Sequence, residues 1–115
     1  MLLFVDDESI ARKYFKALYG DRCEIEVADS AEQAREILKD KAHHIDLVIC
    51  DYLMTGENGL SLLKHCQTDY PSIRRVLVSA VRELEFDRAL KEGLVETVLA
   101  KPFQDSDIYE LLVTI

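Results

Sequence analysis

The fold of this chain is decided by Leu47-Val48-Ile49-Cys50-Asp51, four apolar residues followed by an acid. An unbroken apolar run of this kind is typical of a parallel strand that helices cover on both faces. Ligands bind beyond the carboxyl ends of such strands. Three carboxylates, a hydroxyl and an ammonium are therefore expected to share one site, because three other apolar runs also stop at polar residues: Leu2–Val5 before Asp6-Asp7, Val76–Val78 before Ser79, and Val98–Ala100 before Lys101-Pro102.

Helical stretches alternate with these runs, which is typical of a βαβ architecture. We predict strands at residues 2–5, 24–28, 47–50, 74–78 and 95–100, with 47–50 central and 24–28 in an outer position. Helices are predicted at 8–18 and at 84–92, the second followed by a C-cap at Gly93. Three more are predicted to begin after an N-cap at Ser30, where Gln33 completes a capping box, near Gly59, and at 106 or 107. Right-handed crossovers place helices on both faces of the sheet, which predicts a three-layer α/β sandwich. The side chains expected to face inward are Ala11, Phe15, Leu18, Ala34, Ile37, Leu38, Leu60, Leu63, Cys66, Phe86, Ala89, Leu90, Ile108, Leu111 and Leu112.

Composition limits the class of protein. With 115 residues, 49% of them hydrophobic, the chain can fill one core, and we expect a single domain over residues 1–115. The net charge of −8 and the scattered basic residues argue against direct nucleic-acid binding, which needs a positive face. Three cysteines without a C-x-x-C pair favour a reducing compartment, with Cys50 and Cys66 in the core. Because no apolar stretch is long enough for a signal peptide or a membrane span, we expect a cytoplasmic protein without membrane contact.

The acids predict a metal site. Adjacent acids such as Asp6 and Asp7 can be no more than a solvated turn, or acids favoured at the start of a helix. Here they follow a strand of a parallel pattern, and Asp51 follows another. Three carboxylates at close range repel one another unless a cation neutralises them. Mg²⁺, or Mn²⁺ in its place, would supply that charge through oxygen ligands.

The segment after Asp51 favours a binding loop over a simple structural cap. It contains two glycines, Gly56 and Gly59, so its backbone can wrap closely and present amides to an anion. A carboxylate beside Mg²⁺ can accept a phosphoryl group. Ser79 alone is a common turn residue and Lys101 alone a common surface charge. Behind apolar strands, however, Lys101 can pair with Asp51 at rest and with a phosphoryl oxygen afterwards, while Pro102 permits a cis peptide.

In order and spacing, these motifs resemble the receiver domain of two-component response regulators over essentially the whole chain. The motifs that carry the resemblance are Val5-Asp6-Asp7-Glu8, residues 46–59 from Asp46 to Gly59, Val78-Ser79-Ala80 and Ala100-Lys101-Pro102-Phe103. The resemblance implies a flavodoxin-like (βα)5 fold with a five-stranded parallel sheet in the order 2-1-3-4-5. It implies a phosphorelay protein with no output domain in this chain, which phosphorylates and dephosphorylates itself but turns over no external substrate.

The resemblance also implies a role for each matching residue. Asp51 would accept the phosphoryl group from a histidine kinase or a histidine phosphotransfer protein. Asp7 would bind Mg²⁺ directly, Asp6 largely through water, and Asp51 and the backbone carbonyl of Leu53 would complete the metal site. Ser79 would move to hydrogen-bond the phosphoryl group, and Lys101 would contact it. The face formed by the helix at 84–92, the last strand and the last helix would then change partners, including a possible second copy of the chain.

Two positions depart from the family pattern. Thr55 stands where proline is usual, and Val98 stands where many receivers carry an aromatic ring that turns inward on activation. Valine has no ring to turn, so one interpretation is that activation acts through backbone shifts or through dimerisation. The other interpretation is that Val98 is only a packing residue. These departures keep a second function open, a receiver-like docking or dimerisation module that is not phosphorylated. Ile10 and Tyr14 lie off the inward stripe of their helix, and we expect them to be either a kinase-docking patch or ordinary exposed residues.

Overall fold

Five parallel strands form one sheet in the computed structural model, which describes all residues from Met1 to Ile115. The strands are β1 (Leu2–Val5), β2 (Ile25–Ala28), β3 (Leu47–Asp51), β4 (Arg74–Ser79) and β5 (Thr97–Ala100). Their spatial order is β2-β1-β3-β4-β5, so the central strand is the apolar run that ends at Asp51. The predicted flavodoxin-like topology is confirmed, including the outer position of residues 25–28.

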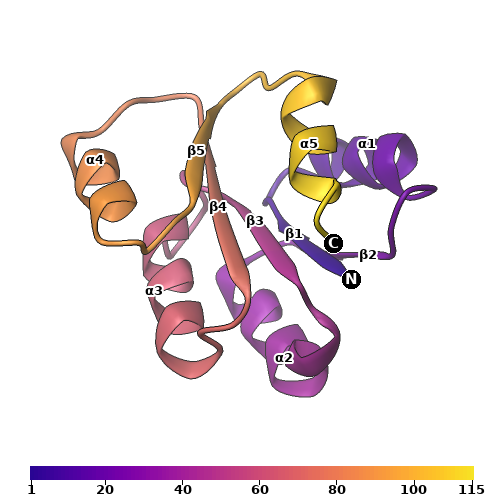
Figure 1. The fold of residues 1–115 in the computed structure, drawn as a ribbon, viewed down its shortest axis with the longest axis horizontal. Helices are drawn as coiled ribbons and strands as arrows, with labels where there is room; N and C mark the ends of the chain where they lie inside the picture. The colour runs from indigo at the N-terminus through magenta and orange to yellow at the C-terminus, as the bar shows by residue number, and fades with distance from the viewer.

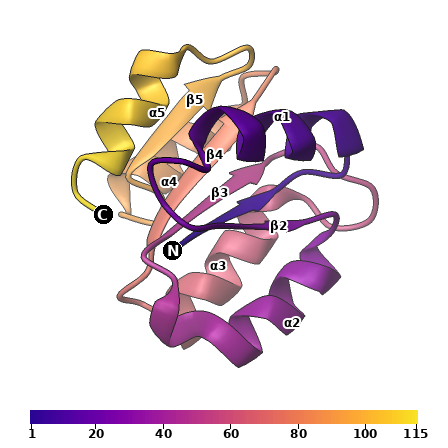
Figure 2. The ribbon, with the colours of Figure 1, turned by 90° about the vertical axis from the view of Figure 1, so that its right-hand side faces the viewer.

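Helices cover both faces of the sheet (Figures 1 and 2). The α-helices are α1 (Ser9–Tyr19), α2 (Ala31–Lys41), α3 (Gly59–Asp69), α4 (Leu84–Lys91) and α5 (Asp105–Leu112), and a short 3-10 helix follows α2 at Ala42–His44. Helices α1 and α5 pack on one face with Phe4 and Ile49, while α2, α3 and α4 pack on the other with Val5 and Cys50. Alternate residues of β1 and β3 therefore supply two separate cores, as the unbroken apolar runs require. None of these helices is both long and apolar enough to cross a membrane.

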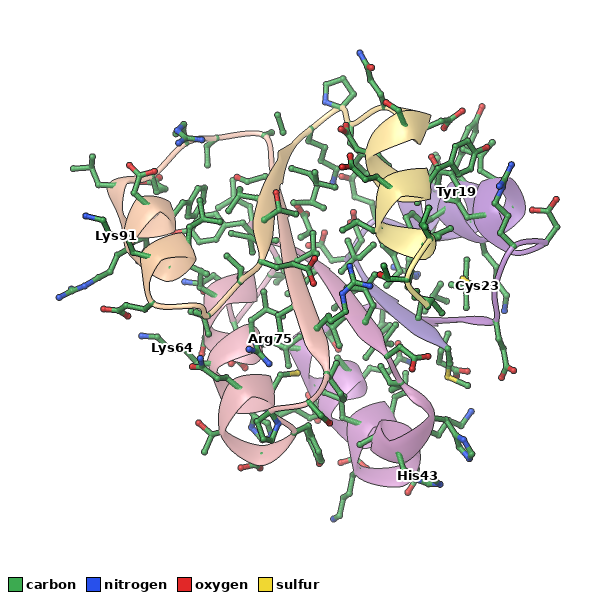
Figure 3. All side chains as sticks on the ribbon, in the orientation of Figure 1. Tyr19, Cys23, His43, Lys64, Arg75 and Lys91 are labelled. Carbon is green, nitrogen blue, oxygen red and sulfur yellow. The ribbon has the colours of Figure 1, made fainter.

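Most of the predicted inward side chains are buried, but two leucines are exposed. Leu18 is 45% exposed, and its predicted place in the core belongs to Tyr19, which is 1% exposed. Tyr19 lies between α1 and α5 (Figure 3), and its hydroxyl donates to Asp105 at 2.6 Å. Since that hydroxyl has a partner, the ring can be buried without loss. Leu90 is 38% exposed, because α4 buries only Phe86 and Ala89.

The ends of several elements differ from the prediction by a few residues. Strand β5 begins at Thr97 and not at residue 95, because Leu94 and Val95 donate their N–H groups to the Ala89 carbonyl at the end of α4. Gly93 takes the positive φ of 72° that this helix end requires. Helix α5 begins at Asp105, earlier than predicted, with a capping box between Gln104 and Asp107.

The start of α2 also shows one difference from the prediction. Ser30 accepts from the Gln33 N–H at 3.0 Å, as predicted for the N-cap. The predicted capping box is incomplete, because the Gln33 side chain accepts from the Asp29 N–H and not from that of Ser30. Both bonds still satisfy amides at the start of the helix.

Arg75 anchors the end of the molecule opposite the predicted site. Its side chain lies between α3 and the strands (Figure 3) and donates to the carbonyls of Ile73 and Leu94, both at 2.7 Å. These bonds connect the entry of β4 to the turn before β5. The guanidinium is thus occupied by structural carbonyls and is not available to an anion.

Candidate functional site

Three carboxylates meet where β1 and β3 end. The two strands are neighbours in parallel register, with Val5 opposite Cys50, so Asp6 and Asp51 emerge side by side. Asp6 is 1% exposed and Asp51 is 7% exposed, while Asp7 is open to solvent. Each of the three offers a carboxylate oxygen, and these oxygens lie within 4.8 Å of one another. The structure thus brings together the three acids that the sequence placed at one edge.

Lys101 enters this cluster from the end of β5. Its Nζ lies 2.9 Å from Asp6 Oδ2 and 3.5 Å from Asp51 Oδ2. The ammonium therefore pairs first with Asp6, whereas the sequence predicted Asp51 as its resting partner. Burial acts to lower the pKa of Lys101, but the hydrogen bond to Asp6 and the nearby negative charges outweigh it and raise the pKa. The peptide bond between Lys101 and Pro102 is cis, as the sequence allowed.

One ammonium does not neutralise three acids. The pKa of Asp51 is raised to about 6, first by burial and then by the negative charge of Asp6, against the opposing charge of Lys101. The site therefore carries an excess of negative charge that a further cation would relieve. Oxygen ligands of an octahedral ion at about 2.1 Å lie about 3–4 Å apart, which fits the spacing of these carboxylates.

Two donors around the acids were not found from the sequence. Arg12, one turn into α1, donates to the backbone carbonyl of Asp6 at 2.9 Å. Thr55 donates both its N–H, at 3.1 Å, and its hydroxyl, at 3.3 Å, to Oδ2 of Asp7. A proline at position 55 could make neither bond, so this departure from the family pattern gives Asp7 a partner. The available sequence signal was a basic residue in the first turn of the helix that follows the acids, six residues after Asp6.

The loop from residue 52 to residue 58 is held at both ends. At its start, the Tyr52 N–H donates to Val78 of β4 at 2.8 Å. At its end, both oxygens of Glu57 accept from the guanidinium of Arg35 on α2, and Ser61 donates to Glu57 at 2.7 Å. Arg35 and Ser61 lower the pKa of Glu57 to about 2, with the Arg35 hydrogen bond as the larger cause.

Gly59 and Leu53 complete this loop. A Cβ on Gly59 would lie 2.4 Å from the backbone oxygen of Asp51, so only glycine fits where α3 begins. Gly56 has φ of 89°, which glycine adopts without strain. Leu53 is exposed and lies two residues after Asp51, at the position for which the family resemblance implied a metal-binding carbonyl.

Ser79 lies at the end of β4, buried and already hydrogen-bonded. Its hydroxyl donates to the Val81 carbonyl at 2.7 Å and accepts from the Val81 N–H at 3.1 Å. Val98 is half-buried and packs against the core beneath α2, α3 and α4. The serine is therefore bonded to the loop before α4 in this structure, and Val98 is a packing residue without a polar contact.

Ile10 and Tyr14 project from the outer side of α1, with exposed fractions of 74% and 66%. Tyr14 also lines a mostly apolar groove of about 350 Å³ that separates α1 from the turn after β5. Lys101 and Phe103 line the opposite side of this groove. An apolar surface thus lies directly beside the acid cluster.

Comparison with known proteins identifies the family. Residues 2–113 match the response regulator receiver domain. The chain belongs to this family. This receiver domain is 32% identical over 108 residues to the transcriptional regulatory protein MalR of Bacillus subtilis, covering 90% of this chain and 44% of that protein. It is also 32% identical over 120 residues to the transcriptional regulatory protein DcuR of Escherichia coli K12, covering 96% of this chain and 48% of that protein.

Solved receiver domains share the fold. A response regulator receiver protein from Pseudomonas putida superposes with a TM-score of 0.89 at 27% identity, over 99% of this chain and 95% of that one. The signal receiver domain of an HD domain-containing protein from Pseudomonas fluorescens gives 0.87 at 26% identity, over 98% and 90% of the two chains. The receiver domain described here spans about half the length of the curated relatives it matches.

Proposed function

We propose that this receiver domain is a phosphorylation-controlled switch in which Asp51 accepts the phosphoryl group. The observation that carries the proposal is the meeting of Asp6, Asp7 and Asp51 within 4.8 Å beside the ammonium of Lys101. Three acids at such spacing are unfavourable for folding alone, since like charges disfavour one another's ionised forms. A reaction that needs a metal and a nucleophilic carboxylate accounts for them.

In the transfer step, a carboxylate oxygen of Asp51 bonds to the phosphorus of a phosphohistidine. The P–N bond breaks, its electron pair leaves on the imidazole nitrogen, and an imidazole protonated at its other nitrogen departs neutral. Lys101 is placed 3.5 Å from Asp51 and can follow the new phosphoryl oxygens by giving up part of its contact with Asp6. The acyl phosphate later hydrolyses at the same residue, so the domain turns over no external substrate.

Mg²⁺, or Mn²⁺ in its place, fits the all-oxygen set of donors here, and when bound it supplies positive charge to the phosphoryl oxygens. Asp7 would hold the metal directly, Asp6 largely through water, and Asp51 and the Leu53 carbonyl would complete its protein ligands. Thr55 holds one oxygen of Asp7 and leaves the other free.

Ser79 would carry the switch. Its hydroxyl is bonded to Val81, so turning toward a phosphoryl oxygen would release the loop before α4. The face formed by α4, β5 and α5 would then change its partners, which include a second copy of the chain or an output domain. Two exposed apolar side chains at the ends of its helices, Leu84 at the start of α4 and Val113 just after α5, support its use as a contact surface.

The phosphoryl donor would be a cytoplasmic histidine kinase or histidine phosphotransfer protein. The apolar groove beside Tyr14 lies next to Lys101 and the acids, so a helix docked there would bring its histidine close to Asp51. Ile10 and Tyr14 would contact that helix. Relatives of this chain include a sensor kinase, CckA of Brucella abortus, 28% identical over 103 residues.

Acyl-phosphate formation tests the proposal. The wild-type chain and the Asp51→Asn variant would be incubated with acetyl phosphate and Mg²⁺, and phosphorylated protein measured by intact mass. We expect a gain of one phosphoryl group in the wild type and none in Asp51→Asn. Equal labelling of both chains would refute the assignment. Absence of labelling with any donor would favour the alternative, a docking or dimerisation module that is not phosphorylated.

A further inference from the structure

Few side chains attach α4 to the rest of the molecule. Of its eight residues only Phe86 and Ala89 are buried, and Leu84 at its start is 90% exposed. The segment from residue 80 to residue 83, which leads into the helix, is exposed throughout. The position of α4 therefore depends on a small number of contacts, and each can be identified.

One of these contacts begins at the residue after Asp51. The Tyr52 hydroxyl donates to Oε1 of Glu85 on α4 at 2.5 Å. The Tyr52 ring meets Phe86 edge-on, with centroids 4.8 Å apart and planes inclined by 82°. Hydrogen bonds to ionised carboxylates are stronger than neutral ones, and this edge-to-face geometry is favourable for aromatic pairs. Tyr52 thus makes both a polar and an apolar contact with the first turn of α4.

The backbone of Tyr52 is bound on its other side to the strands of the acceptor site. Its N–H donates to the carbonyl of Val78, the neighbour of Ser79, at 2.8 Å, and its carbonyl accepts from the Gly59 N–H at 2.9 Å. Any shift of the peptide after Asp51 therefore moves a residue whose side chain is attached to α4.

The core under α4 shows why this residue matters in this chain. Val98 packs there without a ring, and the only buried aromatic side chains of that core cluster are Tyr52 and Phe86. The aromatic ring that packs against Phe86 of α4 therefore comes from the acceptor loop. A ring supplied by β5, as in many receivers, is absent.

We propose that Tyr52 is a positioning residue that couples α4 to the acceptor loop, so that α4 follows the movement of this loop when Asp51 is phosphorylated. The inference rests on the proposed function and adds the route by which its signal leaves the site. Two connections then act on one segment. Ser79 releases Val81 at the start of the segment, and Tyr52 moves Glu85 at its end. Without the Tyr52 hydroxyl, Asp51 is still phosphorylated but α4 no longer responds.

Amide hydrogen exchange of residues 84–91, with and without beryllofluoride and Mg²⁺, tests the coupling. The variants are Tyr52→Phe, Glu85→Ala and the double variant, and Tyr70→Phe is the matched control, since Tyr70 is a half-buried tyrosine whose hydroxyl has no protein partner. In the wild type and in Tyr70→Phe we expect a several-fold change in exchange on adding the analogue. In Tyr52→Phe and Glu85→Ala this change should fall below about two-fold, and the double variant should lose no more than either single one.

Acyl-phosphate formation in the same variants separates the coupling from the chemistry. We expect Tyr52→Phe to be phosphorylated within about two-fold of the wild-type rate, because the change removes only an oxygen that points to α4. A wild-type response of α4 in Tyr52→Phe would overturn the coupling and leave the proposed function standing. A wild type that neither responds to the analogue nor forms an acyl phosphate would overturn the proposed function, and the coupling with it.

Discussion

Replacing Asp51 with asparagine should stabilise the metal-free protein, and more so as the pH rises. Burial, and then the negative charge of Asp6, raise the pKa of Asp51 to about 6 from its ordinary value of 3.8. The folded state therefore binds a proton more tightly than the unfolded state does. Below about pH 4 Asp51 is protonated in both states and has no effect on stability. From about pH 4 to pH 6 it ionises in the unfolded state but stays protonated in the folded state, so the free energy of unfolding falls as the pH rises.

The size of this effect follows from the shift. About two pKa units correspond to about 3 kcal/mol of unfolding free energy once both states are ionised. About 1 kcal/mol is already present near pH 4.5, so the advantage of Asp51→Asn should grow by about 2 kcal/mol between pH 4.5 and pH 8. Asparagine also loses the 3.5 Å contact with Lys101, but the shorter contact of Lys101 with Asp6 remains. Comparing the two pH values cancels constant terms of this kind.

Urea unfolding of both chains in EDTA, followed by circular dichroism, measures the difference. Adding Mg²⁺ should then stabilise the wild type by mass action and stabilise Asp51→Asn much less. Parallel pH profiles for the two chains, or a variant less stable than the wild type near pH 8, would refute the electrostatic reasoning. The Asp46→Asn variant is a suitable control, because Asp46 is an exposed acid at the opposite end of the sheet that pairs with the N-terminal amine.

Three other changes test separate parts of the structure. Gly59→Ala should lower the free energy of unfolding by about 1–3 kcal/mol, since its Cβ would lie 2.4 Å from the backbone oxygen of Asp51. If chemical denaturation shows no loss of stability, the backbone at the start of α3 must shift without cost. Arg35→Ala should speed amide exchange in residues 53–58 by removing the bidentate partner of Glu57, and the charge-exchanged pair Arg35→Glu with Glu57→Arg should restore protection. Burial raises the pKa of all three thiols, strongly for Cys50 and to about 11 for Cys66, but only Cys23 is partly accessible to solvent. Cys23 should therefore react first with a thiol reagent in the native state, and faster labelling of Cys50 or Cys66 would contradict their burial.

The strands could be predicted because each buried strand is a short apolar run that ends on a polar residue, whereas their order was an implication of the resemblance to receiver domains. The same feature placed Asp6, Asp7, Asp51, Ser79 and Lys101 at one edge, since parallel strands end on the same side of their sheet. Which side chains of a helix face the core was harder to predict from the sequence. Leu18 and Tyr19 are adjacent and both fit an apolar stripe, and the choice between them depends on Asp105, which lies 86 residues from Tyr19.

The contacts that no sequence pattern revealed are those between segments far apart in the chain. The pairing of Arg35 with Glu57, and that of Tyr52 with Glu85, require α2 and α4 to be packed at particular positions on the sheet. The sequence predicted Asp51 as the resting partner of Lys101, but Asp6 and Asp51 both lie within reach of the ammonium and only the tertiary structure places Asp6 closer, at 2.9 Å against 3.5 Å.

The sequence by itself determined the layered parallel fold and the residue types at the carboxyl edge of the sheet, because strand periodicity and the direction of the chain are local properties. Only the tertiary structure decided which hydrogen bonds connect this edge to the surrounding loops and helices. It placed Thr55 on Asp7, Ser79 on Val81 and Tyr52 on α4. These contacts depend on distances across packed elements, and a linear pattern of residues does not contain those distances.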